Sequence, residues 1–241
     1  MLRFYFVIVV SIFSILYFLG KSHQIEKSPD QYTMAERYEL ARFACNTIQR
    51  NSRINTKVFG LDNLPQEGGY IMYPNHQGKY DAVGIVHSLA EPCSFVVDKN
   101  RSNVLLLDQV TFLVDGKRLD KSDIRGQIKI ISDVAKEVSE GRRYIIFPEG
   151  GYEEEVTDNS VKDFMPGAFK AATKSECPII PVALIDSFPI FRVNSLRRAN
   201  CEIHYLDPIT YSDYKDLNTH QISDLVKSRI ENKINEVLSA R

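Results

Sequence analysis

Cysteine is scarce in this chain, and its few copies are widely spaced. The 241 residues include only 4 Cys, and no two of them form a C-x-x-C pair. Zinc knuckles and thioredoxin-type redox centres need such pairs, so the spacing argues against both classes. Isolated cysteines in a chain of this length are typical of buried thiols in a reducing compartment. The four are Cys45, Cys93, Cys177 and Cys201.

An excess of charge of either sign is also missing. Lys and Arg number 30 against 31 for Asp and Glu, which gives a formal net charge of -1. The chain therefore has no overall field to hold nucleic acid, and any anion site has to come from a local cluster of cations. A hydrophobic content of 44% with 25% charged residues is ordinary for a globular protein and excludes a disordered or fibrous one.

Several catalytic signatures are absent from the sequence. There is no G-x-S-x-G elbow of a serine hydrolase, no Walker A loop and no H-E-x-x-H zinc motif. No two of the 12 glycines are spaced as G-x-G, which disfavours a dinucleotide-binding loop. We therefore expect neither a metal nor an organic cofactor.

The N-terminus carries one long hydrophobic run, from Phe4 to Leu19, which only Ser11 and Ser14 interrupt. A helix over it would rise about 24 Å, somewhat less than the ~30 Å hydrocarbon core of a bilayer. A spanning helix, an anchor within one leaflet and a cleaved signal peptide all fit such a run. No small-x-small cleavage site precedes Lys21, which disfavours the signal peptide. We expect residues 1–20 to be a membrane anchor.

The next segment, residues 21–50, reads as a linker followed by an amphipathic helix. Residues 21–30 are polar and end in Ser-Pro-Asp, whereas residues 31–50 carry apolar side chains at helical spacing among arginines. This helix either covers the core or lies on a bilayer beside the anchor, as basic amphipathic helices do.

Residues 51–241 alternate between strand-like and helix-like patterns. The length fits one large domain, and the alternation predicts a single α/β domain whose mixed, largely parallel central sheet is flanked by helices. Helices are expected over residues 82–89, 124–140, 167–173 and 212–241. Strands are expected over residues 58–61, 70–73, 94–97, 110–114, 144–147, 179–185 and 203–206.

Polar side chains follow two of these strands, at positions where α/β sheets place their active sites. His76 follows the strand at 70–73, and Asp81 begins the next helix five residues later. A carboxylate that accepts one imidazole N–H leaves the other ring nitrogen free as a general base. The alternative is a polar loop histidine beside an aspartate that the helix dipole favours. Glu149 and Gly150 follow the strand at 144–147 and present either a functional carboxylate or a plain turn.

Together these segments resemble the lysophospholipid acyltransferase family, in particular its 1-acylglycerol-3-phosphate O-acyltransferases. The resemblance covers about residues 58–206. Its motifs are Asn75-His76-x-x-x-x-Asp81, Phe147-Pro148-Glu149-Gly150 and the strand 179–184, with supporting matches at Gly60-Leu61-Asp62-Asn63-Leu64-Pro65 and Phe164-x-Pro166-Gly167-Ala168-Phe169.

The resemblance implies a role for each matching residue. His76 matches the general base that deprotonates a lysophospholipid hydroxyl, and Asp81 matches the carboxylate that orients it. Asn75 either holds the turn or donates toward the developing oxyanion. Glu149 and Gly150 match the motif that binds the acceptor.

The acceptor phosphate needs a cation, and here the chain departs from the family pattern. The family often continues F-P-E-G-T-R, whereas this chain has Gly151-Tyr152 after Gly150 and therefore lacks that arginine. Arg118, Lys121 and Lys99 are the candidates to replace it; Lys121 would keep the charge of an arginine but not its fork.

The implied reaction moves a fatty acyl chain from acyl-CoA or an acyl-carrier protein to the sn-2 hydroxyl of lysophosphatidic acid, giving phosphatidic acid. The resemblance also implies work at a lipid bilayer, and reduced cysteines place the catalytic domain on the cytoplasmic side. Two alternatives remain: an acyltransferase for another lysophospholipid headgroup, and a membrane-anchored lipid-binding protein without catalysis. Only the enzymes would need His76 and Asp81 together.

Overall fold

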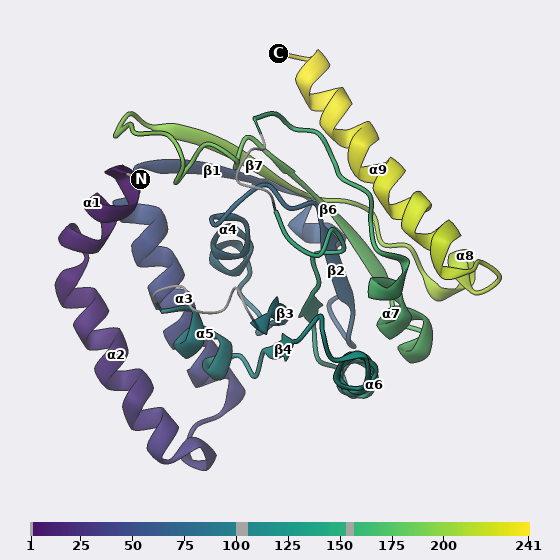
Figure 1. The fold of residues 1–241 in the computed structure, drawn as a ribbon, viewed down its shortest axis with the longest axis horizontal. Helices are drawn as coiled ribbons and strands as arrows, with labels where there is room; N and C mark the ends of the chain where they lie inside the picture. Colours follow the sequence, from purple (N-terminus) through teal and green to yellow (C-terminus); the bar gives the residue numbers. More distant parts are fainter. Residues whose placement is uncertain (1, 100–105, 153–156) are drawn as a thin grey trace.

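A seven-stranded sheet runs through the centre of the computed structural model, which describes residues 2–99, 106–152 and 157–241 (Figure 1). The strand order is β1-β7-β6-β2-β5-β3-β4. The strands are β1 (Ile54–Phe59), β2 (Ile71–Pro74), β3 (Ser94–Asp98), β4 (Lys117–Leu119), β5 (Tyr144–Ile145), β6 (Ile179–Ile185) and β7 (Ala199–Tyr205).

The sheet is mixed but mostly parallel. The five neighbouring strands β6, β2, β5, β3 and β4 all pair in parallel. Strand β7 pairs antiparallel with β6 on one side and parallel with β1 on the other. Parallel neighbours need crossover connections, and helices supply these here. The expected single α/β domain with a mixed, largely parallel sheet flanked by helices is confirmed.

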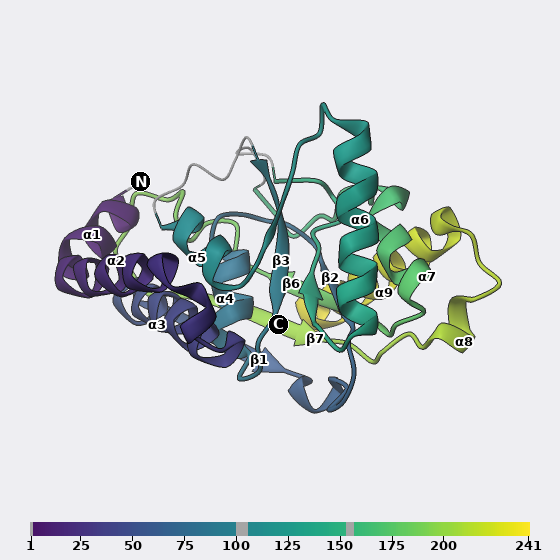
Figure 2. The ribbon, with the colours of Figure 1, turned by 90° about the horizontal axis from the view of Figure 1, so that it is seen from below.

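Helices cover both faces of the sheet, as the view in Figure 2 shows. On one face, α2, α3, α4 and α5 contribute to one apolar core; on the other, α6, α7 and α9 contribute to a second. These helices are α2 (Ile12–Lys27), α3 (Met34–Asn51), α4 (Asp81–Ser88), α5 (Leu107–Leu113), α6 (Ile124–Ser139), α7 (Lys170–Ser175) and α9 (Thr219–Ser239), with a short α8 (Tyr211–Tyr214).

Strand β6 explains why the sheet needs cover on both sides. All seven of its residues are buried, and alternate ones point into opposite cores: Ile180 and Leu184 into the first, Ile179 and Ala183 into the second. A continuous apolar run of this kind is the signature of a central strand in a doubly covered sheet.

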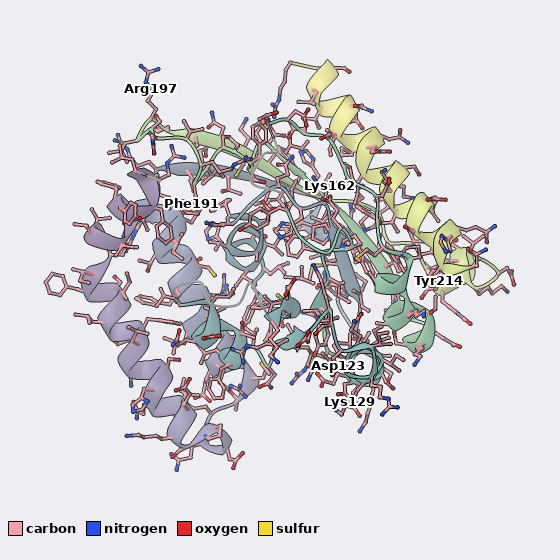
Figure 3. All side chains as sticks on the ribbon, in the orientation of Figure 1. Asp123, Lys129, Lys162, Phe191, Arg197 and Tyr214 are labelled. Carbon is pink, nitrogen blue, oxygen red and sulfur yellow. The ribbon has the colours of Figure 1, made fainter. Side chains whose placement is uncertain are left out.

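The hydrophobic N-terminal run forms two helices, α1 (Leu2–Val10) and α2, which meet at Ser11 with a bend of 71°. In the described part of the chain, no single helix is long and apolar enough to cross a membrane, although this bent pair passes the same test together. The Arg3 guanidinium donates to the carbonyl of Ile190 at 2.8 Å, and Phe4 meets Phe191 edge-on, so α1 is docked on the segment between β6 and β7. Phe191 is labelled in Figure 3.

Residues 21–27, expected as a linker, are helical: α2 continues to Lys27. That expectation was wrong because polar residues on a solvent-facing helix resemble a linker in composition. Phe18 and Ile25 of α2 are buried in the first core and secure the helix along its length.

Helix α3 covers the core, which decides between the two interpretations given for it. A capping box between Thr33 and Glu36 starts the helix. Tyr38, Ala41 and Cys45 are buried in the first core, against α2, α4 and β1. This face therefore lies against protein rather than on a bilayer.

Residues 110–114, expected as a strand, belong instead to α5 and its C-terminal cap. Periodicity alone cannot separate a short buried helix from a strand. The Arg37 guanidinium donates to the carbonyl of Phe112 at the end of α5, a tertiary contact with no sequence signature. Strand β3 pairs with β5 on one side, and its partner on the other side is the short β4, which lies a few residues after α5.

Gly60, which follows β1, offers a test of the fold. Its φ is +74°, and a Cβ there would stand 2.1 Å from the backbone oxygen of Tyr205. Gly60→Ala should therefore lower the free energy of unfolding by more than about 1 kcal/mol, measured by chemical denaturation in detergent. Gly20→Ala is the matched control: it lies inside α2 with nothing within 4 Å. It should stabilise the helix by about 0.5–1 kcal/mol. Equal stability of the two variants would contradict this account.

Candidate active site

The site forms where the carboxyl ends of neighbouring parallel strands meet. Strand β2 lies between β6 and β5 and runs parallel to both, so the segments after all three leave the same edge of the sheet. The segment after β2 carries His76, the one after β5 carries Glu149, and the one after β6 carries Ser187. The edge beyond β3 and β4 adds Lys121.

His76 and Asp81 form a direct pair. The Nδ1 atom of the His76 ring lies 2.7 Å from Oδ2 of Asp81. The Asp81 side chain is fully buried, whereas 14% of the His76 side chain is exposed. A buried carboxylate that accepts from Nδ1 fixes the imidazole tautomer and turns Nε2 away, toward the open side. The sequence-predicted contact of these two residues across the start of a helix is present in the structure.

The Asp81 carboxylate is held by additional donors. Oδ2 also accepts the backbone N–H of Gln77 at 2.6 Å and that of Gly78 at 2.8 Å, and Oδ1 accepts the Ser187 hydroxyl at 2.6 Å. A buried carboxylate is costly unless its oxygens are hydrogen-bonded, and these donors meet that requirement. Asp81 therefore sits as a fixed anion behind His76.

The His76 ring lies between two aromatic rings. It stacks on Phe147, with centroids 4.0 Å apart, and Tyr152 meets it edge-on at 4.7 Å. All three line a cavity of about 590 Å³ together with apolar side chains from α1, α2, α3 and α6. His76 is thus one of the polar groups in the wall of a mainly apolar cavity. A small number of polar groups in an apolar cavity is the usual arrangement of a ligand site.

Glu149 holds the backbone of the histidine rather than its ring. Its Oε1 accepts the N–H of His76 at 3.0 Å. Burial raises the pKa of Glu149 to about 7; the charge of Asp81 adds to the rise, whereas the His76 N–H and the positive charge of Lys162 (labelled in Figure 3) oppose it. Gly150 lines the cavity next to it, with φ at +71°.

Asn75 is completely buried, and its side-chain amide is bonded to one backbone position. Its Nδ2 donates to the carbonyl of Leu184 at 3.0 Å, and its Oδ1 accepts the N–H of Leu184 at 2.7 Å. This pair of bonds extends the β2–β6 pairing beyond the end of β2. Of the two roles open to Asn75, the geometry favours holding the turn.

The three candidate cations lie in different surroundings. Lys121 lines the cavity, where its ammonium donates to the carbonyl of Gly150 at 2.6 Å and lies 3.0 Å from Asp98. Arg118 pairs with Asp108 at 2.8 Å, and Lys99 lies 3.4 Å from Asp120. The structure therefore brings Lys121 to the cavity beside Gly150, and it places Arg118 and Lys99 outside the cavity lining.

Two residues of the site, Gln77 and Ser187, were not singled out from the sequence, and Phe147 and Tyr152 were named there without their contact with the His76 ring. A usable signal existed for Ser187, because it follows the apolar strand 179–185 at a strand end, where functional polar groups gather. No comparable signal marks the aromatic pair. Among the described residues, no cluster of three or more His, Cys, Asp or Glu side chains is arranged to hold a metal ion.

The raised pKa of Glu149 makes stability depend on pH. Its folded-state pKa of about 7 lies above the ordinary 4.5, so the native state binds this proton more tightly than the unfolded state. The resulting stabilisation is complete below pH 4.5 and is lost as the pH rises through 7. Glu149→Gln keeps an acceptor for the His76 N–H but does not titrate.

Between pH 5 and pH 8, wild type should therefore lose about 1–2 kcal/mol of unfolding free energy relative to Glu149→Gln, allowing for solvent screening. Urea unfolding at the two pH values measures this difference. Glu39→Gln, at an exposed position on α3, should leave the pH slope of wild type unchanged. Parallel pH slopes for wild type and Glu149→Gln would show that Glu149 does not titrate in this range.

Comparisons with known proteins place this geometry in a family. The acyltransferase family model matches residues 55–185, more than half of the chain. The 1-acyl-sn-glycerol-3-phosphate acyltransferase alpha of Ovis aries is 23% identical over 196 residues, which cover 80% of this chain and 67% of the relative. The 1-acyl-sn-glycerol-3-phosphate acyltransferase of Escherichia coli (strain K12) is 26% identical over 171 residues, which cover 70% of this chain and 69% of the relative.

A solved structure shares the whole fold. The crystal structure of the 1-acyl-sn-glycerophosphate (LPA) acyltransferase PlsC from Thermotoga maritima superposes with a TM-score of 0.72 at 18% identity, covering 100% of this chain and 95% of that one. The family match includes both His76 and Asp81, as well as the segment with Glu149. The resemblance inferred from the sequence motifs is confirmed: this chain belongs to the acyltransferase family.

Proposed function

We propose that this protein transfers a fatty acyl chain from an acyl thioester to the sn-2 hydroxyl of 1-acylglycerol 3-phosphate, making phosphatidic acid. The observation that carries the proposal is the His76–Asp81 pair, 2.7 Å apart, with the imidazole at the wall of a long apolar cavity. The names of the relatives from sheep and Escherichia coli support this acceptor.

In the proposed reaction, Nε2 of His76 takes the proton from the acceptor hydroxyl. The hydroxyl oxygen attacks the thioester carbonyl carbon, a C–O bond forms, and the C–S bond breaks. The leaving thiolate then takes the proton back from the imidazolium. Asp81 stabilises the imidazolium while it exists, as the aspartate of a catalytic triad does, but no serine nucleophile and no acyl-enzyme are needed.

The cavity has room for acyl chains. Its walls are formed mainly by aliphatic and aromatic side chains of α1, α2, α3, α4 and α6, and its volume is about 590 Å³. Burying an acyl chain against such walls gains about 0.8 kcal/mol for each methylene. With the thioester carbonyl near His76, the acyl chain of the donor would lie against the apolar walls of the cavity. Acyl-CoA and an acyl-carrier protein both remain possible donors, because the carrier would lie outside the apolar part.

Lys121 is the proposed partner of the acceptor phosphate. It stands at the cavity wall beside Gly150, where the family motif implies acceptor binding. An ammonium group supplies a point charge and charge-assisted hydrogen bonds to a phosphate. Tyr152 stands at the position where the family often has an arginine. A lysophospholipid with a different headgroup is therefore the second candidate acceptor.

The N-terminal helices are the proposed membrane contact. Val9 is 71% exposed and Phe13 is 84% exposed, and other large apolar side chains of α1 and α2 are exposed around them. Contiguous exposed apolar surface of this kind fits an interaction with lipid. The four cysteines are free and buried, which supports a catalytic domain on the cytoplasmic side.

His76→Ala tests the proposal. A positioned general base contributes about 100- to 10,000-fold, so kcat for acyl transfer to lysophosphatidic acid should fall by that factor with the fold intact. The assay uses the full chain in detergent, acyl-CoA and a panel of lysophospholipids. His87→Ala is the control, because His87 lies on α4 outside the site and bonds Asn46. Unchanged turnover of His76→Ala would overturn the mechanism. If the protein instead binds lipid without catalysis, wild type itself will show no acyl transfer.

Lys121→Ala and Arg118→Ala separate the candidate cations. Loss of a charge-assisted hydrogen bond to phosphate costs about 1.5–3 kcal/mol, so KM for lysophosphatidic acid should rise tenfold or more in Lys121→Ala. The kcat and the donor KM should change little, because the lost contact is uniform binding. Arg118→Ala should resemble wild type, since Arg118 pairs with Asp108 away from the cavity. An unchanged acceptor KM in Lys121→Ala would remove Lys121 from the phosphate site.

A further inference from the structure

We propose that Ser187 is a positioning residue of the active site, which holds the Asp81 carboxylate so that Asp81 can orient His76. This inference rests on the proposed function of the pair as a catalytic base. Ser187 follows β6 and is 4% exposed, and it does not line the cavity. It therefore lies behind the His76–Asp81 pair, on the side away from the substrate.

The hydrogen bonds around Ser187 determine where its proton points. The hydroxyl oxygen lies 2.6 Å from Oδ1 of Asp81 and 2.8 Å from Oε1 of Gln77. That Gln77 oxygen already accepts the backbone N–H of Ser187 at 2.9 Å. A hydroxyl has one proton to give, and a carboxylate is the stronger acceptor. The proton of Ser187 is thus donated to Asp81.

The two oxygens of Asp81 consequently have separate partners. Oδ2 accepts from the His76 ring and from two backbone N–H groups, whereas Oδ1 accepts from Ser187. Within the described residues, Ser187 is the donor that the structure gives to Oδ1. Because Asp81 is fully buried, loss of the Ser187 hydroxyl would leave Oδ1 without this donor, and the carboxylate would be held through Oδ2 alone.

A second layer of contacts keeps Ser187 in place. Asp186, just before it, has a φ of +60°, which turns the chain sharply at the end of β6. Asn159 holds this turn: its Oδ1 accepts the Asp186 N–H at 2.8 Å, and its Nδ2 donates to Asp186 Oδ1 at 2.8 Å. The same Asn159 oxygen accepts the Gln77 amide at 2.9 Å. The loops after β2 and β6 are therefore joined through one asparagine.

The geometry also distinguishes this role from that of a nucleophile. A serine that forms an acyl-enzyme donates its proton to the histidine base and faces the substrate. The Ser187 hydroxyl instead donates to the aspartate, and the residue lies outside the cavity lining.

Ser187→Ala removes the donor and keeps the backbone. We expect kcat to fall by about 10- to 100-fold, the loss expected for a hydrogen bond to a charged group, with KM for both substrates nearly unchanged. The acidic limb of the kcat/KM profile should move to higher pH. A carboxylate with one donor fewer attracts the imidazolium proton more strongly, so His76 reaches its basic form at higher pH.

Other ionisable groups near the pair are the same in all variants. They are Glu149 after β5, Asp186 after β6, Tyr80 before α4, Tyr152 on the His76 ring, Cys201 on β7 and Lys162 near Glu149. The shift of the kcat/KM pH profile is therefore measured relative to wild type, and Ser195→Ala is the control variant. Ser195 belongs to the same β6–β7 segment but bonds the N–H of Arg197.

Ser187→Thr and Ser187→Val form a pair of nearly equal shape that keeps the result interpretable if the alanine variant is unstable. The threonine variant retains the hydroxyl and should recover most of the kcat and the wild-type pH profile, whereas the valine variant should not. Equal kcat values for Ser187→Thr and Ser187→Val would overturn the proposal. An unshifted kcat/KM pH profile in both Ser187→Ala and Ser187→Val would also overturn it. So would an acyl group found on Ser187 by mass spectrometry.

Wild type and His76→Ala are measured in parallel. If wild type transfers the acyl group and His76→Ala does not, a wild-type kcat and pH profile in Ser187→Ala would overturn the positioning role of Ser187. The proposed function would then still stand. If wild type transfers no acyl group to any lysophospholipid, the proposed function fails, and the effect of Ser187 on the pair is tested without turnover. NMR titration of the His76 ring then gives the remaining check on the contact, because its midpoint should rise in Ser187→Ala and not in Ser195→Ala.

Discussion

The buried carboxylate of Asp81 is the constraint on which the rest of the site depends. A fully buried negative charge is tolerated only where hydrogen-bond donors surround it, and here the donors come from two loops. The loop after β2 gives the His76 ring and the N–H groups of Gln77 and Gly78, and the loop after β6 gives Ser187. Because β2 and β6 are parallel neighbours, both loops leave the sheet at the same edge, and the strand order itself makes the arrangement possible.

The apolar parts of the molecule serve two purposes at once. The cover on one face of the sheet, formed by α2 to α5, secures the sheet and also supplies walls of the cavity that reaches His76. Phe18 of α2 belongs to the core and also lines the cavity, while Phe13 on the same helix is exposed. The helix pair of α1 and α2 thus contributes to the outer apolar surface, the cavity and the core. An acyl chain is the class of ligand that such a continuous apolar path suits.

The sequence predicted the features that depend on long, regular patterns. The bounds of β6 agree with the expected 179–185, and α6 begins at the expected Ile124. A seven-residue apolar run rich in isoleucine and valine favours a buried strand, and a long amphipathic repeat favours a helix. Short or irregular segments were less predictable. The run 110–114 belongs to a short helix and its cap, where Arg37 bonds the Phe112 carbonyl, and the polar end of α2 resembled a linker. The contact of His76 with Asp81 followed from motif spacing, whereas Ser187 reaches Asp81 from 106 residues away along the chain, and no local pattern encodes such a pairing.

Tyr152 stands at the position where the family pattern often has an arginine. At this position the chain presents a ring that packs edge-on against His76, so the side chain next to the base contributes packing rather than charge. Among the three cations proposed from the sequence, Arg118 and Lys99 are directed to carboxylates outside the cavity, while the ammonium of Lys121 meets the Gly150 carbonyl at the cavity wall. Lys121 therefore reaches Gly150 from a different strand connection, the one after β4.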